Sequence, residues 1–421
     1  MPLFIGLAIY RLVLQVYHLM LKLAAIFGHQ KAKSWVKGRV GWRDEIQKIS
    51  SDKRDKIWIH CASLGEYEMA VPLMQQLKNR YPQKAVVLSF FSPSGFQYCA
   101  EATHFDYKIY LPIDSPKNAR FFVEKINPKV AVFVKYELWY YYLSELNRKD
   151  IPVFLINAQW SGNAVFFKWY GVLHREMLQY FKHVFVNDGQ TMELASEILP
   201  ADKISLSVDS RIERVLAIKN QSYKISDFEN FRQESKILIS GSSYLDEENV
   251  LLEFLNNHAA SSKCIIAQHN INRERIASIE RQFERYKPLL LSKWESYSAE
   301  DRKDSKVLVV DSIGQLSRIY RYADLAIVGG GFRGALHNAY EPLVYEIPVF
   351  FGADFGGVAN WQKLLDQGLA FTFETSADFE EKANQFLKVE HNEQLKTKVQ
   401  LFWEQEKKSE NTVLEEIQKF I

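Results

Sequence analysis

Cysteine is scarce in this chain of 421 residues, since only Cys61, Cys99 and Cys264 occur and no two of them form a CxxC pair. An odd and widely spaced set indicates neither a disulfide framework nor a zinc site, and it is typical of a reducing cytoplasm. A surplus of charge is also missing, because 53 Lys and Arg residues stand against 51 Asp and Glu residues. The sequence therefore offers no bulk electrostatic attraction for nucleic acid, and we expect no such partner.

Two nucleotide-binding signatures are absent as well. The chain contains no Walker-type GxxxxGK[ST] loop and no Asp-x-Asp, the carboxylate pair that commonly holds a nucleotide-bound divalent ion. What is present is a globular composition, with 47% apolar and 25% charged residues and no long low-complexity tract. At this length the chain exceeds one ordinary core, so we expect two large domains.

The beginning of the chain is apolar but interrupted. Arg11, Gln15, His18 and Lys22 follow one another at spacings of four, three and four, which place them on one face of a helix. A spanning helix would bury Arg11 and Lys22 at a cost of about 2.5 to 3.5 kcal/mol each, whereas a helix lying in the membrane surface keeps them in water. We favour the surface helix; a first helix packed on the next domain is the alternative. The basic residues that follow would suit anionic lipids: Lys31, Lys33, Lys37, Arg39 and Arg43.

From Ile57 onward, short β-rich runs alternate with helical stretches. This alternation is typical of parallel sheets with crossover helices. The pattern thins between Asp209 and Ser235 and then restarts. The expected strands are IWIHCAS, AVVLSFF, VAVFVKY, PVFLINA and HVFVND in the first half, and KILISGSS, CIIAQHN, VLVVDS, DLAIVGGG and IPVFFGA in the second.

The restart predicts two α/β domains. We expect a membrane-associated helix over residues 1–28, an N-terminal domain over 29–215, a linker over 216–234 and a C-terminal domain over 235–421, whose last helix could cross back to the first domain. Ligands of open α/β sheets bind at the carboxyl ends of the strands, so two such domains facing one another would form a cleft.

The first motif, CASLGEYE, follows the first expected strand. Ser63, Gly65 and Glu66 form the turn into a helix. The spacing of Ser63 and Glu66 is that of a capping box, so Glu66 could simply satisfy the start of the helix, and taken alone the motif favours this role. A carboxylate at the carboxyl end of a strand is also placed to be a general base, which we expect the helix dipole to keep ionised.

Two further motifs follow strands in the second half. In ILISGSSYLDEE, Gly241 and Ser242 would let backbone N–H groups approach a phosphate, although a serine N-cap fits as well. In DLAIVGGGFRGALHNAYEPLVYEIPVFF, His337 and Asn338 precede an expected helix with Glu341 one turn in. Helix N-terminal amides beside an imidazole suit a phosphate, and the carboxylate can bind sugar hydroxyls. A turn with a capping Asn is the alternative.

Several short blocks in a fixed order resemble one family, the 3-deoxy-D-manno-octulosonic acid (Kdo) transferases of Gram-negative lipopolysaccharide synthesis. The resemblance runs over most of the chain and includes the apolar N-terminal helix. It makes the capping role a poor account of Glu66. The blocks are Ser63-x-Gly65-Glu66, Ser94-Gly95, Glu137-Leu138-Trp139, Asn157-Ala158, Ser161, Gly241-Ser242, Gly314 with Leu316, and His337-Asn338 with Glu341-Pro342.

The resemblance implies a GT-B fold of two Rossmann-like parallel-sheet domains. It also implies an inverting transfer of Kdo from CMP-Kdo to a lipid A precursor, lipid IVA, with no metal and no cofactor, at the cytoplasmic side of the cell inner membrane. Glu66 corresponds to the general base of the family. The acceptor or cleft positions are Ser63, Gly65, Ser94, Glu137 and Asn157. The nucleotide-binding positions of the C-terminal domain are Gly241, Ser242, His269, Gly314, Leu316, His337, Asn338 and Glu341.

This chain departs from the family pattern at a few positions. Where Pro-Arg-His is common, it has Ala267-Gln268-His269, so a cation expected on the CMP phosphate is absent, and Arg273 or Arg275 could replace it. On the acceptor side, a Lys and a Tyr stand where an acidic residue and Thr are usual, and a Gln stands where Arg is usual: Lys135, Tyr136 and Gln159.

Two other functions remain open from the sequence. One keeps the fold and changes the donor, to a UDP-sugar-dependent transferase or epimerase. The other is a catalytically silent, membrane-bound protein that binds sugar nucleotides. The retention of Glu66 together with the His337 block argues against the silent protein, which would not need a base.

Overall fold

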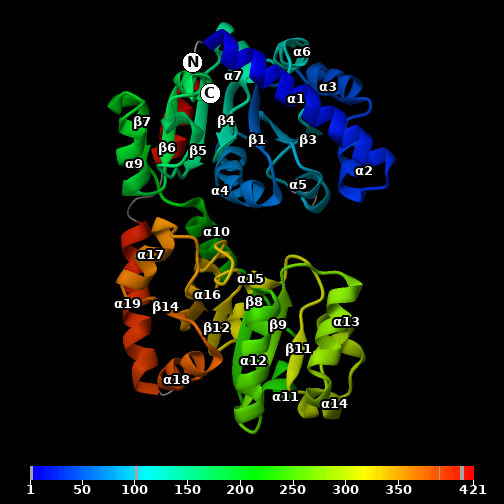
Figure 1. Ribbon diagram of the computed structural model, residues 1–421, viewed down its shortest axis with the longest axis vertical. Coiled ribbons are helices and arrows are strands. Elements are labelled where there is room, and N and C mark those ends of the chain that lie inside the picture. The colour runs from blue at the N-terminus through cyan, green and yellow to red at the C-terminus, as the bar shows by residue number, and fades with distance from the viewer. Residues whose placement is uncertain (1–2, 100–102, 388, 408–411) are drawn as a thin grey trace. The chain divides into compact units, whose positions relative to one another are not determined.

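The computed structural model describes residues 3–99, 103–387, 389–407 and 412–421. The chain divides into two compact units, unit 1 with residues Met1–Ser210 and Ser409–Ile421 and unit 2 with residues Arg211–Lys408 (Figure 1). The division therefore falls after Ser210 and not at 215. The segment expected as a linker includes the end of one helix and a second short helix, α10 (Ser210–Lys219) and α11 (Phe228–Arg232).

Unit 1 is built on a seven-stranded parallel sheet with the order β3-β2-β1-β4-β5-β6-β7. Its central strands are buried on both faces, as a sheet covered by crossover helices requires. The order reverses between β1 and β4, and at such a switch point α/β proteins bind ligands. The strands are β1 (Lys56–Cys61), β2 (Ala85–Phe90), β3 (Tyr107–Tyr110), β4 (Pro128–Val134), β5 (Val153–Ala158), β6 (His183–Val186) and β7 (Ile204–Leu206).

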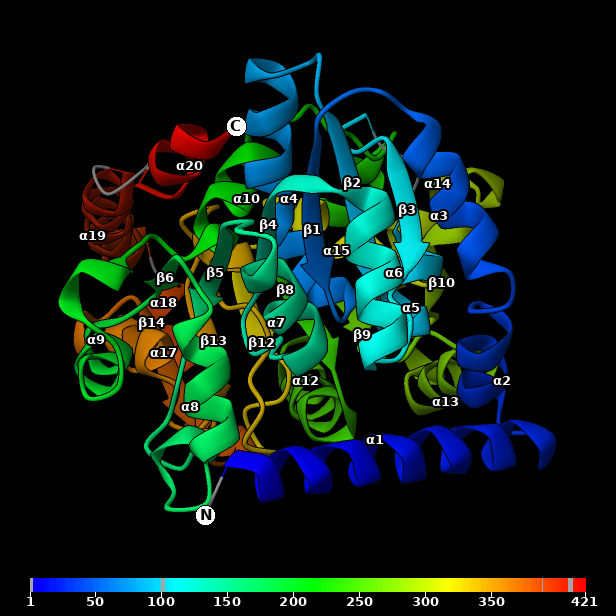
Figure 2. The same ribbon diagram turned by 90° about the horizontal axis from the view of Figure 1, so that it is seen from above.

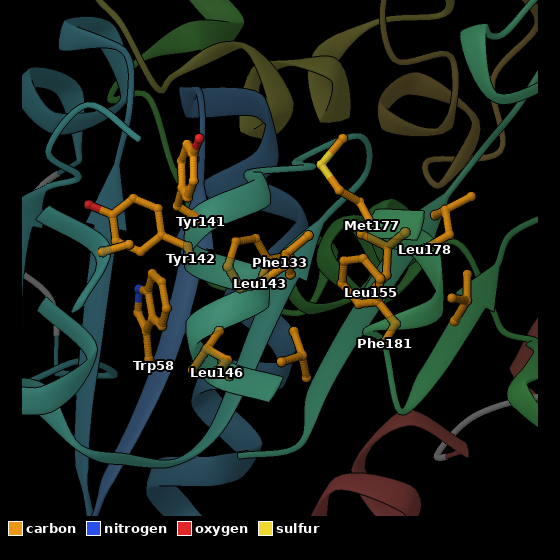
Figure 3. Packing of buried hydrophobic residues seen from close by; sticks show 14 of the residues in the cluster. Trp58, Phe133, Tyr141, Tyr142, Leu143, Leu146, Leu155, Met177, Leu178 and Phe181 are labelled. Atoms are coloured by element: carbon orange, nitrogen blue, oxygen red, sulfur yellow. The ribbon is translucent and has the colours of Figure 1, made fainter. Parts of the chain in front are cut away.

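Helices cover both faces of this sheet. On one face, α4 packs with α20 at the end of the chain, where Leu414 and Ile417 join the core. On the other face, aromatic and aliphatic side chains of α7 pack against side chains of β1, β4 and β5 (Figure 3). The helices are α1 (Leu3–Ile26), α2 (Gln30–Lys37), α3 (Trp42–Ser51), α4 (Leu64–Arg80), α5 (Pro93–Tyr98), α6 (Pro116–Ile126), α7 (Tyr140–Arg148), α8 (Val172–Gln179), α9 (Gly189–Ser196) and α20 (Thr412–Ile417).

The N-terminal helix α1 is one straight rod that contacts α8 and α2 (Figure 2). We expected its polar stripe to face water, and Arg11, Gln15 and Lys22 are indeed exposed, but part of the stripe also contacts the rest of unit 1. The Arg11 guanidinium donates to the Tyr141 hydroxyl, and Arg11, Gln15 and His18 line a cavity of about 350 Å³ against unit 1. The neighbouring Tyr10 hydroxyl donates to buried Asp114 at 2.7 Å. Tyr10 and Arg11 thus attach the helix to the rest of unit 1, while large apolar side chains such as Leu12, Leu19 and Met20 stay exposed.

Unit 2 repeats the architecture with a second parallel sheet, in the order β10-β11-β9-β8-β12-β13-β14. The register between β8 and β9 shifts between Gly241 and Ser243, which breaks the end of β8 out of regular pairing. The strands are β8 (Lys236–Ser243), β9 (Ser262–Gln268), β10 (Leu289–Leu290), β11 (Val307–Val309), β12 (Leu325–Val328), β13 (Val349–Gly352) and β14 (Ala370–Phe373).

The helices of unit 2 are α12 (Leu245–His258), α13 (Arg273–Gln282), α14 (Ala299–Asp304), α15 (Leu316–Ile319), α16 (Tyr340–Leu343), α17 (Ala359–Asp366), α18 (Ser376–Phe386) and α19 (Val389–Lys407). Each of the ten runs expected as strands contains one. The expected α/β class, with two parallel-sheet units and an apolar N-terminal helix, is thus confirmed.

Candidate functional site

Glu66 lies at the turn between β1 and α4, at the switch point of the first sheet. The Ser63 hydroxyl accepts a hydrogen bond from the Glu66 N–H at 3.5 Å, and the Ala62 N–H donates to Oε2 of the Glu66 carboxylate. The Ser63 cap therefore forms as the spacing predicted, and the Glu66 carboxylate bonds the N–H of Ala62, the residue before the cap. At Gly65 an added Cβ would meet nothing within 4 Å, so the space beside the turn is open to a ligand.

The Glu66 carboxyl is held in its protonated form. Burial is the main cause, and the charge of Glu137 adds to it; together they raise the pKa of Glu66 to about 8, although the Ala62 N–H and Lys135 act in the opposite direction. The helix dipole does not keep Glu66 ionised at neutral pH, and that expectation was wrong. A carboxylate with a raised pKa is a stronger base once it has lost its proton.

Glu137 is fixed by polar side chains that lie inside the sheet. Oε2 of Glu137 lies 3.1 Å from Nε2 of His60 and accepts from the Trp139 indole N–H at 2.7 Å. Nδ1 of His60 lies 2.8 Å from the Ser89 hydroxyl, which also accepts from the Trp58 indole N–H. With its proton on Nε2, His60 donates to Glu137 and accepts from Ser89, so every member of this chain is satisfied.

The remaining acceptor-side residues divide into two places. Ser94 lies in α5, next to Gly95, where a Cβ would stand 3.0 Å from the backbone of Ser63; the two turns are in direct contact. Asn157 lies apart, because its Oδ1 accepts from the Ser210 N–H at 3.2 Å and from Asn187 at 3.4 Å. The structure thus brings together Ser63, Gly65, Glu66, Ser94 and Glu137 and gives Asn157 a separate structural role.

In unit 2, the end of β8 packs against Tyr320. A Cβ at Gly241 would collide with the Tyr320 hydroxyl and lie 3.1 Å from Leu316, so only glycine fits there. Burial and the charge of Glu341 both raise the pKa of Tyr320. Gly241, Leu316 and Glu341 therefore meet around a tyrosine that the sequence analysis did not single out.

Beside this cluster, three rings are stacked. The ring centroids of His269 and His337 are 4.5 Å apart, those of Tyr244 and His269 are 5.1 Å apart, and the Tyr244 hydroxyl lies 3.2 Å from Nε2 of His337. Burial, with a smaller effect of His269, lowers the pKa of His337 to about 4. His337 is therefore neutral near pH 7, and it can offer a phosphate a hydrogen bond but no charge.

The glycine-rich segment leads into a helix of only four residues. Helix α16 spans only Tyr340–Leu343, with Glu341 as its second residue, and Asn338 accepts from the Tyr340 N–H at 3.2 Å. His337 and Asn338 precede the helix as expected, but Glu341 lies at its start and not one turn in, and four residues make a weak dipole. Two other residues predicted to bind the nucleotide, Ser242 and Gly314, have positive φ angles of 52° and 82°.

The two candidate cations behave differently. Arg275 donates to both oxygens of buried Glu248 at 2.6 and 2.7 Å, so it is already paired. Arg273, the first residue of α13, is exposed and stays the candidate for the missing cation. The side-chain amide of Gln268 is buried and makes no hydrogen bond within the described part of the chain. No group of three or more metal-ligating side chains occurs among the described residues.

Comparisons with known proteins show which family the chain resembles. Residues 35–214 match the family model of the 3-deoxy-D-manno-octulosonic-acid transferases (kdotransferase). A 3-deoxy-D-manno-octulosonic acid transferase of Chlamydia trachomatis is 26% identical over 368 residues, covering 80% of this chain and 83% of the relative. A bifunctional glycosyltransferase/methyltransferase of Fusobacterium nucleatum is 24% identical over 386 residues, covering 86% of this chain but only 58% of that longer protein.

A solved structure shares the fold. The structure of a putative UDP-N-acetylglucosamine 2-epimerase from Listeria monocytogenes superposes with a TM-score of 0.57 at 10% identity, covering 82% of this chain and 91% of that chain. Its identity is too low to say more than that the fold is shared. The family model and the relatives together show that the chain is a glycosyltransferase similar to the Kdo transferases.

Proposed function

We propose that the protein transfers Kdo from CMP-Kdo to a lipid A precursor, lipid IVA, with inversion at the anomeric carbon and without a metal ion. The observation that carries this proposal is the pair Glu66 and Glu137 at the switch point of the first sheet, where the second carboxylate is fixed and raises the pKa of the first. The names of the relatives supply the sugar.

In the proposed reaction, unit 1 supplies the base. Ionised Glu66 accepts the proton of an acceptor hydroxyl as that oxygen forms a bond to the anomeric carbon of Kdo. The bond from this carbon to the CMP phosphate oxygen breaks, and CMP leaves with the electron pair. Attack opposite to the leaving group inverts the configuration. Glu137 does not take the proton; it sets the basicity of Glu66 and stays hydrogen-bonded to His60 and Trp139.

Unit 2 supplies the donor site in this proposal. Gly241 and Ser242 bring backbone close to the nucleotide, Glu341 binds ribose hydroxyls, and neutral His337 donates a hydrogen bond to the phosphate. Arg273 meets the charge that grows on the leaving group, since Arg275 is paired with Glu248. Preorganised donors of this kind stabilise a departing phosphate without reorganising during the reaction.

The N-terminal helix supports a location at the cytoplasmic face of the inner membrane. By length and composition α1 could cross a membrane, with a mean hydropathy of 1.6 and only 6% of its most apolar window buried. Because Tyr10 and Arg11 bond α1 to the rest of unit 1 while large apolar side chains stay exposed, we propose that α1 lies in the membrane surface as a peripheral anchor. The side chains left exposed are Phe4, Ile9, Leu12, Val13, Val16, Leu19, Met20 and Ile26.

One assay tests this function. The purified protein is incubated with CMP-Kdo and the lipid A precursor, and CMP release and the mass of the lipid are both measured. We expect stoichiometric CMP release with addition of Kdo to the lipid. Since the fold is shared with a UDP-N-acetylglucosamine 2-epimerase, UDP-N-acetylglucosamine is tested in parallel. Turnover of that compound, with no Kdo added to the lipid, would replace the proposal with the UDP-sugar alternative.

A further inference from the structure

A small apolar pocket of unit 1 has no role in the transfer described above. It has a volume of about 260 Å³ and lies between α1, α2 and the turn that follows β2. Tyr17, Leu21 and Ala24 of α1 form one wall, and Trp35 lies in α2. The outer side of the same α1 segment carries Leu19, which is 57% exposed, so the pocket adjoins the surface that we assign to the membrane. The complete lining is Tyr17, Leu21, Ala24, His29, Lys31, Ala32, Trp35, Phe91, Ser92 and Pro93.

The far wall of the pocket is bonded to the catalytic turn. The Ser92 N–H donates to the Ala62 carbonyl at 2.7 Å, and the Ala62 N–H donates to the Glu66 carboxylate. Next to Ser92, the Phe91 ring lies 4.7 Å from that of Trp139, whose indole N–H donates to Glu137. A molecule bound in the pocket would therefore contact Phe91 and Ser92, which in turn contact the neighbours of Glu66 and Glu137.

The pocket also has a positive rim. Its lining includes His29 and Lys31 and no acidic residue. Behind it, the Arg39 guanidinium stacks 3.8 Å from the Trp35 ring and donates to the carbonyls of Trp35, Phe91 and Leu111. Arg39 forms no ion pair with a carboxylate in the described part of the chain. A half-buried cation without a carboxylate partner favours a negatively charged ligand nearby.

The Trp35 indole adds a second sign of a missing ligand. Trp35 is 3% exposed, and its Nε1–H has no hydrogen-bond partner among the described residues. An unpaired buried donor costs free energy that a ligand acceptor would recover. The pocket thus combines apolar walls, a positive rim and an unpaired donor.

We propose that this pocket binds one acyl chain of the lipid acceptor, with a headgroup phosphate held at Lys31 and His29, and so positions the acceptor hydroxyl at Glu66. The proposal rests on the proposed function and adds an acceptor subsite to it. A chain leaving the membrane beside α1 enters the pocket without crossing water, and a phosphate on the same molecule meets Lys31, while the lining contains no carboxylate.

The test compares a long-acyl with a short-acyl lipid A precursor, measuring both KM for transfer and direct binding in the same detergent. The wild type should prefer the long-acyl acceptor, because it buries more methylene groups, and Ala24→Trp should fill the pocket and reduce that preference about tenfold or more. Leu19→Trp on the exposed side of the same helix is the matched control and should keep the preference.

A second variant covers the case in which Ala24→Trp does not fold. Lys31→Glu, at an exposed position, should weaken binding of the phosphorylated acceptor and leave that of its dephosphorylated form unchanged. The proposal would be overturned if folded Ala24→Trp kept the acyl-chain preference of the wild type. It would also be overturned if Lys31→Glu weakened binding of the phosphorylated and the dephosphorylated acceptor equally. If no acceptor receives Kdo but chain-length-dependent binding persists and is lost in Ala24→Trp, the proposed function fails and the lipid pocket stands.

Discussion

The interaction between Glu66 and Glu137 should be visible in the pH dependence of transfer. Because Glu66 acts only when ionised and its pKa is about 8, transfer should rise with pH through that value and fall below it. Glu137→Gln removes one of the two causes that raise the pKa of Glu66. We therefore expect the rising limb of the pH profile of kcat to move to lower pH in this variant.

The matched control is Glu124→Gln, an exposed carboxylate on α6 that does not enter the pKa of Glu66. Its pH profile should coincide with that of the wild type. If the profile of folded and active Glu137→Gln also coincides with that of the wild type, Glu137 does not raise the pKa of Glu66. Burial would then be the sole cause of the raised pKa.

Local sequence predicted some of these residues and not others. The turn of Ser63 and Glu66 follows from spacing along the chain, and so does its capping geometry. The roles of His60, Trp139 and Tyr320 depend on strands and helices far apart in sequence, and no local spacing encodes them. A weak signal did exist, since His60 is a polar residue inside an otherwise apolar buried strand.

At the level of elements, the central strands were predictable and the edge strands were not. Strands such as β1 and β5 are mostly apolar because both their faces are buried. β3, β7 and β10 lie at or next to sheet edges and span two to four residues, too short to leave a pattern. The spacing of the polar residues in α1 predicted that they share one face of the helix. The contacts of α1 with the rest of unit 1 depend on partners far away in the sequence, such as Asp114, and could not be predicted from it.

Helix α1 also carries a prediction about membrane binding. Deleting residues 1–28 would remove contacts with Asp114 and Tyr141 and so disturb unit 1. The triple variant Leu12→Gln, Leu19→Gln and Met20→Gln changes only exposed side chains. We expect it to sediment less with liposomes than the wild type while its CMP affinity and melting temperature stay unchanged.

Full sedimentation of this triple variant with liposomes would show that the exposed face of α1 is not the anchor. The exchange Arg11→Gln serves as a contrast, because it removes the bond to Tyr141 and leaves the apolar face intact. It should lower the melting temperature and preserve sedimentation.

For the whole molecule, buried carboxyls with raised pKa values predict how stability varies with pH. Burial raises the pKa of Asp114 to about 6, and that of Glu66 is about 8. Since the native state holds these protons more tightly than the unfolded state, their contribution to stability is complete below about pH 4 and is lost as pH rises through the native values. The melting temperature should therefore fall between pH 5.5 and pH 8.5, and Glu66→Gln should reduce that fall.

The measurement that tests the central claim most directly is the transfer rate of Glu66→Gln, with its thermal stability taken on the same preparation at pH 7. A Gln side chain can still accept the Ala62 N–H, so the turn should persist and the melting temperature should not fall. CMP binding should also persist, whereas transfer from CMP-Kdo should drop by about 10² to 10⁴, as loss of a general base does. Turnover within a few-fold of the wild type in this folded variant would contradict the account and leave Glu66 as a helix cap.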